Sequence, residues 1–180
     1  MKSAHVHPRP LIDTLTQYGA LALCVVLLLA ALGQIMALAV GAPGSFVLTA
    51  LLTLAFVPFI LLLTAATPAI IVTPEGLTIQ PRVWREQFVS WDAVRAIKDY
   101  PLLPPEDGET MRKIISGRKS YSPARGKMLV IPQLPPQYRI AGWLAGEGLT
   151  PVIAVTNRTH TDYEHLIEQL EHYLTLRVMP

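Results

Sequence analysis

A long stretch without charged residues constrains this chain more than any other feature. From Thr14 to Pro74 there is no Asp, Glu, Lys or Arg, although charged residues make up 16% of the whole chain. The stretch contains two apolar segments, 14–40 and 45–67, and each exceeds the roughly 20 residues that a helix needs to cross a bilayer. Residues 41–45, GAPGS, separate them and favour a turn. The sequence therefore predicts a transmembrane helical hairpin over 14–67.

A cleaved signal peptide is the alternative interpretation of the first apolar segment. Ala37-Leu38-Ala39 has the small residues of a cleavage site. The apolar segment is longer than the ~7–15 residues of a signal-peptide core, and cleavage there would leave Val40 almost at the start of the second helix. We therefore expect the first helix to be retained.

Positive charge at the base of the hairpin predicts its orientation. Lys2 and Arg9 precede the first helix, Arg82 and Arg85 follow the second, and the turn has no basic residue. Because positive charge is enriched on the cytoplasmic side, both termini are expected in the cytoplasm. The chain is thus predicted to be a multi-pass protein of the inner (cytoplasmic) membrane, with residues 1–13 as a short cytoplasmic segment.

Small residues at every fourth position of the first helix predict a packing face. Gly33, Ala37 and Gly41 form this stripe, which allows another helix to approach closely. We expect the partner to be the second helix of the same hairpin, and the alternative is a helix of another protein. The membrane segments contain no charged residue, which argues against a transport path. The hairpin is interpreted as an anchor or a docking surface.

The remaining residues, 69–180, have an ordinary charge density and are predicted to be mostly β. Short β-branched or alternating runs bounded by turn residues predict strands at 70–73, 77–80, 83–91, 95–97, 111–116, 128–131 and 152–155. Near the C-terminus, Thr161 precedes Glu164 by three residues, as in a capping box. Apolar residues at helical spacing follow and predict an amphipathic helix that covers the β layers; they are Tyr163, Leu166, Ile167, Leu170, Tyr173 and Leu174.

This order of elements resembles the bacterial pleckstrin-homology-like (PH-like) domains, many of which are attached to membrane helices. The resemblance rests on the hairpin sequence IIVTPEGLTI, the bend VSWDAV, the later strands and the C-terminal helix, over roughly 69–176. It implies a membrane-anchored α+β protein, in which a small β-barrel or sandwich is closed by the C-terminal helix. It also implies a binding or scaffolding module, and the family has no single shared ligand.

No set of residues predicts catalysis. There is no Ser or Cys nucleophile in a recognisable setting, and Cys24, the only cysteine, lies in the apolar stretch. The histidines and their neighbours are interpreted as surface or capping residues: His5, His7, His160, Asp162 and His165. We therefore expect no enzyme activity, no metal and no cofactor. The net charge of +2 is too small to suggest a nucleic acid partner.

A basic cluster between Met111 and Met128 is the strongest candidate contact site. The segment contains no acidic residue, and its basic members are Arg112, Lys113, Arg118, Lys119, Arg125 and Lys127. Close to a membrane, each basic side chain contributes ~1 kcal/mol of attraction to anionic lipid. The alternatives are contact with an acidic protein surface and a solvated hairpin without a partner.

Two function classes follow from these features. The first is a non-catalytic accessory or scaffolding subunit that docks on a larger integral membrane protein complex through the hairpin. The second is a free-standing module at the membrane surface that binds anionic lipid headgroups or recruits a soluble partner through the basic cluster. The bilayer is an expected partner in both.

Overall fold

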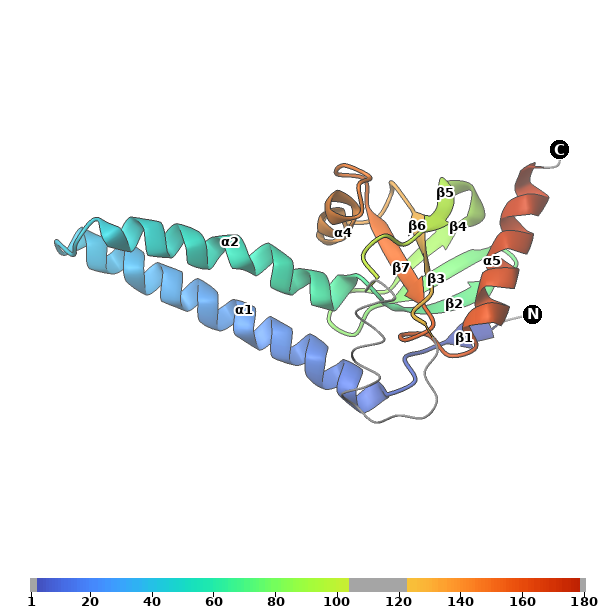
Figure 1. Cartoon of the computed structure of the whole chain (residues 1–180), viewed down its shortest axis with the longest axis horizontal. Helices are drawn as coiled ribbons and strands as arrows, with labels where there is room; N and C mark the ends of the chain where they lie inside the picture. The colour runs from blue at the N-terminus through green and yellow to red at the C-terminus, as the bar shows by residue number, and fades with distance from the viewer. Residues whose placement is uncertain (1–2, 104–122, 179–180) are drawn as a thin grey trace.

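The computed structural model describes residues 3–103 and 123–178 (Figure 1). Helices α1 (Pro10–Ala39) and α2 (Ser45–Ala65) form an antiparallel hairpin that projects from one side of a β domain. Both helices are long and apolar enough to cross a membrane, and most of their large apolar side chains are exposed. Exposure of this kind is unusual for the core helices of a soluble protein. The predicted hairpin is therefore present, with α1 beginning at Pro10 rather than Thr14.

Helices α1 and α2 contact each other along rows of residues spaced alternately by three and four. This spacing is typical of left-handed packing between two nearly antiparallel helices. Cys24 lies level with Val57, because its Sγ is 3.8 Å from the Val57 carbonyl oxygen. The buried and half-buried residues of the rows are Gln17, Ala20, Cys24, Leu27, Ala31, Gln34 and Leu38 in α1, and Ala50, Thr53, Val57, Ile60 and Thr64 in α2.

The predicted stripe of small residues is not this row. Gly33 is exposed, and no heavy atom lies within 4 Å of the position that a Cβ would take. Ala37 is half-buried, and Gly41 lies beyond the end of α1 with a φ of +93° that favours glycine. The expected packing of Gly33 against α2 is thus wrong, because the three–four rows already fill the contact. A helix of another protein remains the alternative partner of this face.

The described strands form two antiparallel sheets. The first has the order β1 (Ser3–His5), β2 (Ala69–Thr73), β3 (Gly76–Gln80) and β4 (Gln87–Ser90). The second has the order β5 (Ala96–Asp99), β6 (Gly126–Val130) and β7 (Val152–Thr156). A short 3-10 turn, η1 (Trp91–Ala93), connects β4 to β5. These strands do not pair across the two sheets, so the expected closed barrel is not formed by the part of the chain that the structure describes.

The second sheet lies between two apolar layers. One face joins the first sheet and the C-terminal helix in the main core, with Leu129 and Ile153 fully buried. The opposite face carries Met128, Val130 and Val152. A short helix, α4 (Arg139–Leu144), and Leu62 of α2 cover that face. The domain therefore packs directly onto the base of the hairpin.

Most of the predicted strands within the described residues are present in the structure. The main difference is in the run 83–91. The run 83–91 contains only the short β4, because Trp84 instead donates a hydrogen bond from Nε1 to Thr64 Oγ1 of α2. The run 111–116 lies outside the described residues. The turn η2 (Pro136–Tyr138) and α4 were not predicted, because six helical residues after a Pro-rich segment give too short a pattern.

The C-terminal helix α5 (Tyr163–Val178) packs its apolar face on the main core, as predicted. Leu166 and Leu170 are fully buried, and the Tyr173 ring stacks on Trp91 with 4.9 Å between ring centroids. The predicted capping box is replaced by tertiary contacts. Thr161 Oγ1 accepts a hydrogen bond from the Val6 N–H, and the Glu164 carboxylate faces Arg125.

The position of Leu166 predicts a large effect of truncation. Leu166→Ala in the full chain should lower the free energy of unfolding by about 2–5 kcal/mol, because it leaves a cavity under α5. Glu168→Ala, on the exposed side of the same helix, should change it by less than about 0.5 kcal/mol. Denaturant titration in detergent measures both. Equal losses in the two variants would contradict the packing of α5.

Candidate functional site

The chain segments before and after the hairpin lie side by side in one sheet. Strand β1 precedes α1 and pairs antiparallel with β2, which follows α2, in the register Ser3↔Val72 and His5↔Ile70. These residues are therefore part of a strand, and His5 is buried, so its interpretation as a surface residue is wrong. A three-residue strand has no periodicity of its own, so the sequence contained no signal for it. We call this region, where both ends of the hairpin meet the domain, the hairpin base.

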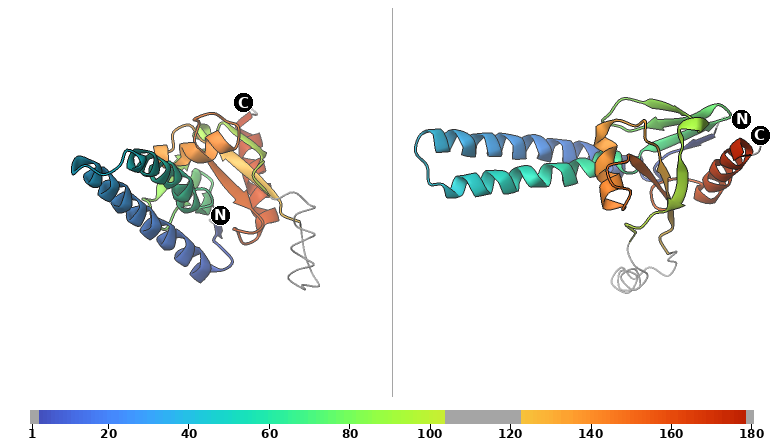
Figure 2. Two further views of the ribbon diagram at one scale, coloured as in Figure 1. Left: turned by 60° about the vertical axis from the view of Figure 1, so that its left-hand side comes forward. Right: turned by 90° about the horizontal axis from the view of Figure 1, so that it is seen from above.

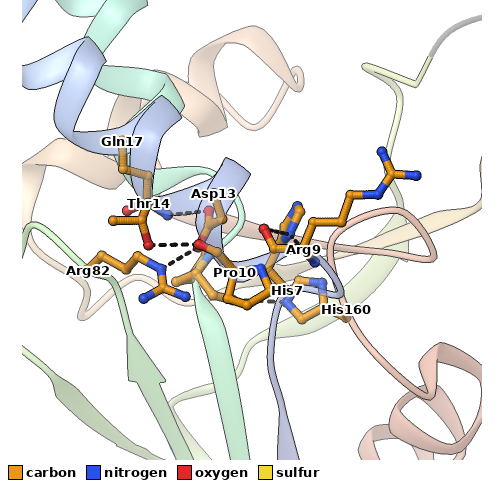
Figure 3. A network of polar contacts seen from close by, with 9 residues as sticks. His7, Arg9, Pro10, Asp13, Thr14, Gln17, Arg82 and His160 are labelled. Carbon is orange, nitrogen blue, oxygen red and sulfur yellow. Dashed lines mark hydrogen bonds and ion pairs between the residues drawn. The ribbon is translucent and has the colours of Figure 1, made fainter.

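A polar network connects the first turns of α1 to the loop after β3 (Figure 3). The Asp13 carboxylate accepts hydrogen bonds from Arg82 Nε at 2.6 Å and from Gln17 Nε2 at 2.7 Å. Arg82 is partly exposed, so the ion pair itself contributes ~0–1 kcal/mol to stability. Its main effect is geometric, because it joins the start of α1 to a segment that follows α2.

His160 forms a second connection, between the end of α2 and the loop that precedes α5. Its Nε2–H donates to the Pro68 carbonyl at 2.9 Å, and its Nδ1 accepts from the Thr156 N–H at 3.3 Å. This arrangement requires a neutral ring with its proton on Nε2. Burial lowers the pKa of His160 to about 4. The Ala154 N–H also donates to the Ala66 carbonyl at 2.7 Å, so β7 contacts the same end of α2.

The N-terminal segment is held by the same loop. The Thr161 N–H donates to the Val6 carbonyl at 3.0 Å, and His5 Nδ1 lies 3.0 Å from the Thr161 carbonyl oxygen. The rings of His5 and His165 are 6.2 Å apart. Within the described residues no three His, Cys, Asp or Glu side chains are arranged to hold a metal ion. The contacts at the hairpin base join the domain to both helices.

A groove lies between α5 and the second sheet. Helix α5 lies at the end of the domain farthest from the hairpin turn (Figures 1 and 2). It has a volume of about 740 Å³, with Arg95 and Ile97 on one wall and Glu171 and Leu174 of α5 on the other. A smaller hollow of about 390 Å³ continues past Lys127, which lines both. We call the two together the α5 groove.

Strand β5 forms an open edge along the α5 groove. It pairs with β6 on one side, and its other side has no partner strand among the described residues. An edge strand presents free backbone N–H and C=O groups that can pair with an added extended segment. Both apolar side chains, such as Ile97 and Leu174, and charged side chains, such as Arg95 and Glu171, line the groove along this edge.

The basic cluster is only partly within the described residues. Arg112, Lys113, Arg118 and Lys119 lie outside them. The fold brings Arg125 within 3.6 Å of Glu164 and Lys127 within 2.9 Å of Asp99. The hydrogen bond from Lys127 to Asp99 raises the pKa of Lys127. These two members of the cluster therefore have acidic neighbours from distant segments, which the local sequence did not show.

Comparison with protein-family models, curated proteins and solved structures gives no significant match.

The buried His160 predicts a loss of stability at acidic pH. Its pKa is lowered in the folded state, so the unfolded chain binds a proton more readily below about pH 6.5. The contribution of the neutral ring is fully present above that pH and is lost as the pH falls toward 4, with a slope of at most ~1.4 kcal/mol per pH unit.

Unfolding midpoints between pH 7 and 4.5 measure this effect. His160→Gln should flatten the pH dependence and reduce stability at pH 7. His172→Gln, on the exposed side of α5, serves as the matched control and should leave the dependence unchanged. An unaltered slope in His160→Gln would contradict the role of a neutral His160.

Proposed function

We propose that this chain is a non-catalytic, membrane-anchored PH-like module that serves as an accessory or scaffolding subunit of a larger integral membrane protein complex. The observation that carries the proposal is the hairpin base, where β1 and β2 join both ends of the hairpin into one sheet. A scaffold must hold its surfaces at a fixed distance and angle. A module that only concentrates a ligand near the membrane needs no more than a flexible tether.

The contacts at the hairpin base support a rigid arrangement. Backbone pairing, the Asp13–Arg82 ion pair and the His160–Pro68 hydrogen bond connect four chain segments that are distant in sequence. The domain cannot rotate about the hairpin without breaking several of them together. A partner that binds the hairpin in the bilayer would therefore also fix the position of the α5 groove.

The PH-like part of the proposal draws on the arrangement of the β domain. Two antiparallel sheets lie against a C-terminal helix, and the helix fills the open side of the main core. The α5 groove is the part of this domain suited to a second contact. An extended segment of a partner subunit, or of a cytoplasmic protein, would add to the edge of β5 and place apolar side chains against α5.

Lipid binding through the basic cluster is the second candidate function. The two described members, Arg125 and Lys127, have acidic partners, and helix α5, which lines the groove beside them, lies at the end of the domain farthest from the hairpin turn (Figure 1). Both features weaken attraction to a lipid surface, since exposed charges act over only ~8–10 Å at ordinary salt. We therefore favour protein docking.

Gly33 provides a test of docking that leaves the hairpin itself intact. Gly33→Leu introduces a side chain into open space on α1, so the contact between α1 and α2 should remain. If a foreign helix packs there, retention of co-purifying membrane subunits should fall at least tenfold. Ala55→Leu, at an exposed position of α2, is the matched control and should retain them. Affinity purification in mild detergent with quantitative mass spectrometry measures retention.

Neutralising all six basic residues distinguishes the alternative. Variants with Gln at Arg112, Lys113, Arg118, Lys119, Arg125 and Lys127 should keep the subunits under the docking proposal. Loss of partners from this variant, with full retention by Gly33→Leu, would show that the charged cluster rather than the hairpin holds the complex. A protein that purifies alone from native membranes in every variant would contradict the accessory role.

We also propose that both termini face the cytoplasm, because basic residues flank only the base of the hairpin. A C-terminal green fluorescent protein should fluoresce, whereas a C-terminal alkaline phosphatase, which folds only outside the cytoplasm, should be inactive. A phosphatase inserted after Pro43, in the turn, should be active. The reverse pattern would place the domain on the other side of the membrane.

A further inference from the structure

Two large apolar side chains are exposed within one short segment of the domain. Trp143, near the end of α4, is 57% exposed, and Leu149, in the loop that follows, is 69% exposed. Ile140, Trp143 and Leu144 share one face of α4 because they are spaced by three and four residues. An exposed tryptophan next to other apolar side chains usually indicates a surface that contacts something other than water.

The position of α4 beside the hairpin indicates what that surface meets. Helix α4 contacts α2 near the hairpin base, as seen from two directions (Figures 1 and 2). The ring centroids of Trp143 and Phe59 are 6.4 Å apart. Phe59 belongs to α2 and is itself 46% exposed, on the outer side of the hairpin. The exposed surface of α4 is thus continuous with the exposed apolar surface of the hairpin.

The length of α2 sets the depth of this contact. A helix of 21 residues is about 31 Å long, which barely matches a hydrocarbon core of ~30 Å. Both ends of α2 must therefore lie near the boundaries of the core. Phe59 precedes the last residue, Ala65, by six residues and so lies ~9 Å inside that end. The Trp143 ring contacts Phe59 from the domain side, so it reaches the boundary of the hydrocarbon core.

The chemistry of the segment suits the boundary between headgroups and hydrocarbon. Tryptophan is enriched there because its ring is apolar and its N–H finds polar partners. Arg139, at the start of α4, is exposed and can extend its guanidinium toward lipid phosphates. A lipid surface therefore satisfies the apolar and the cationic parts of this segment together.

The segment is held firmly enough to keep this position. A Cβ on Gly142 would lie 1.8 Å from the Thr150 carbonyl oxygen, so the returning loop packs directly on the α4 backbone. Glu147 forms an ion pair with Lys98 of β5 at 2.5 Å. The loop is thus joined to the second sheet, and Trp143 and Leu149 are presented by a fixed structure.

We propose that α4 and the loop 145–150 form an interfacial membrane contact, which inserts Trp143 and Leu149 among the headgroups of the bilayer that the hairpin spans. The contact makes the domain lie against the membrane on one side. It rests on the proposed membrane-spanning hairpin, and it does not depend on the identity of any partner complex.

Tryptophan fluorescence of the full chain in vesicles tests the contact. Trp84→Phe and Trp91→Phe leave Trp143 as the only tryptophan, and the protein is reconstituted in phosphatidylcholine vesicles with one fifth phosphatidylglycerol. Lipids brominated near the carbonyl end of the acyl chain should quench its emission at least twofold, and acrylamide should quench it only weakly. Retaining Trp91 alone provides the control, because Trp91 lies in the core and lipid bromine should not quench it.

The opposite result overturns the inference. Strong quenching by acrylamide with no effect of brominated lipid would show that Trp143 faces water in the vesicles. Its natural contact would then be water or a protein partner that the vesicles lack, and not lipid. A tryptophan at Leu52, in a chain whose three native tryptophans are Phe, reports separately on the hairpin. If bromine deep in the acyl chains quenches it while Trp143 is not quenched, only the interfacial contact fails. If neither is quenched, the membrane-spanning hairpin fails as well.

A second measurement avoids the tryptophan substitutions. A nitroxide spin label is attached to Leu149→Cys in a Cys24→Ser chain. The relaxation of the label is then compared in the presence of oxygen, which concentrates in lipid, and of a water-soluble nickel chelate. Greater accessibility to oxygen supports the contact. Greater accessibility to nickel contradicts it, and the same label at the exposed Glu168 of α5 gives the reference for water.

Discussion

The antiparallel pairing of β1 with β2 is the constraint on which the rest of the structure depends. Without it, the domain would be attached to the hairpin mainly through α2. With it, the segments that flank both helices belong to the same sheet. Three residue pairs between β1 and β2 attach the domain to both ends of the hairpin. The sheet also brings His5 and Val6 against the loop before α5. The hairpin and the domain are therefore parts of one packed body.

This attachment explains why buried polar groups gather at the hairpin base. Helix ends leave backbone carbonyls without helical partners, and such groups are costly to bury unpaired. The carbonyls of Ala66 and Pro68, just after α2, accept hydrogen bonds from β7 and from His160. The neutral state of His160 follows, because burial disfavours the charged ring while a neutral ring satisfies a donor and an acceptor.

The two surfaces of the domain have different physical characters. The side facing the hairpin carries the apolar surface around Trp143, whereas the far side carries the α5 groove with its paired charges. An apolar surface gains by contact with lipid, and a polar groove next to an edge strand gains by contact with a peptide. A rigid hairpin base keeps these two surfaces at opposite ends. In the proposed function, this separation would let one subunit contact a membrane partner and a cytoplasmic partner at once.

The sequence by itself determined the features that depend on neighbouring residues. The uncharged stretch predicted both helices of the hairpin, and short β-branched or alternating runs predicted β2, β3 and β7 within one residue at each end. Helical spacing also placed Leu166 and Leu170 in the core. Only the tertiary structure decided which segments meet. The partners of Arg125 and Lys127 come from distant parts of the chain, β1 is too short to show a period, and the open space at Gly33 depends on which face of α1 meets α2. Local patterns report the environment of a residue, and contacts between distant segments arise only when the whole chain packs.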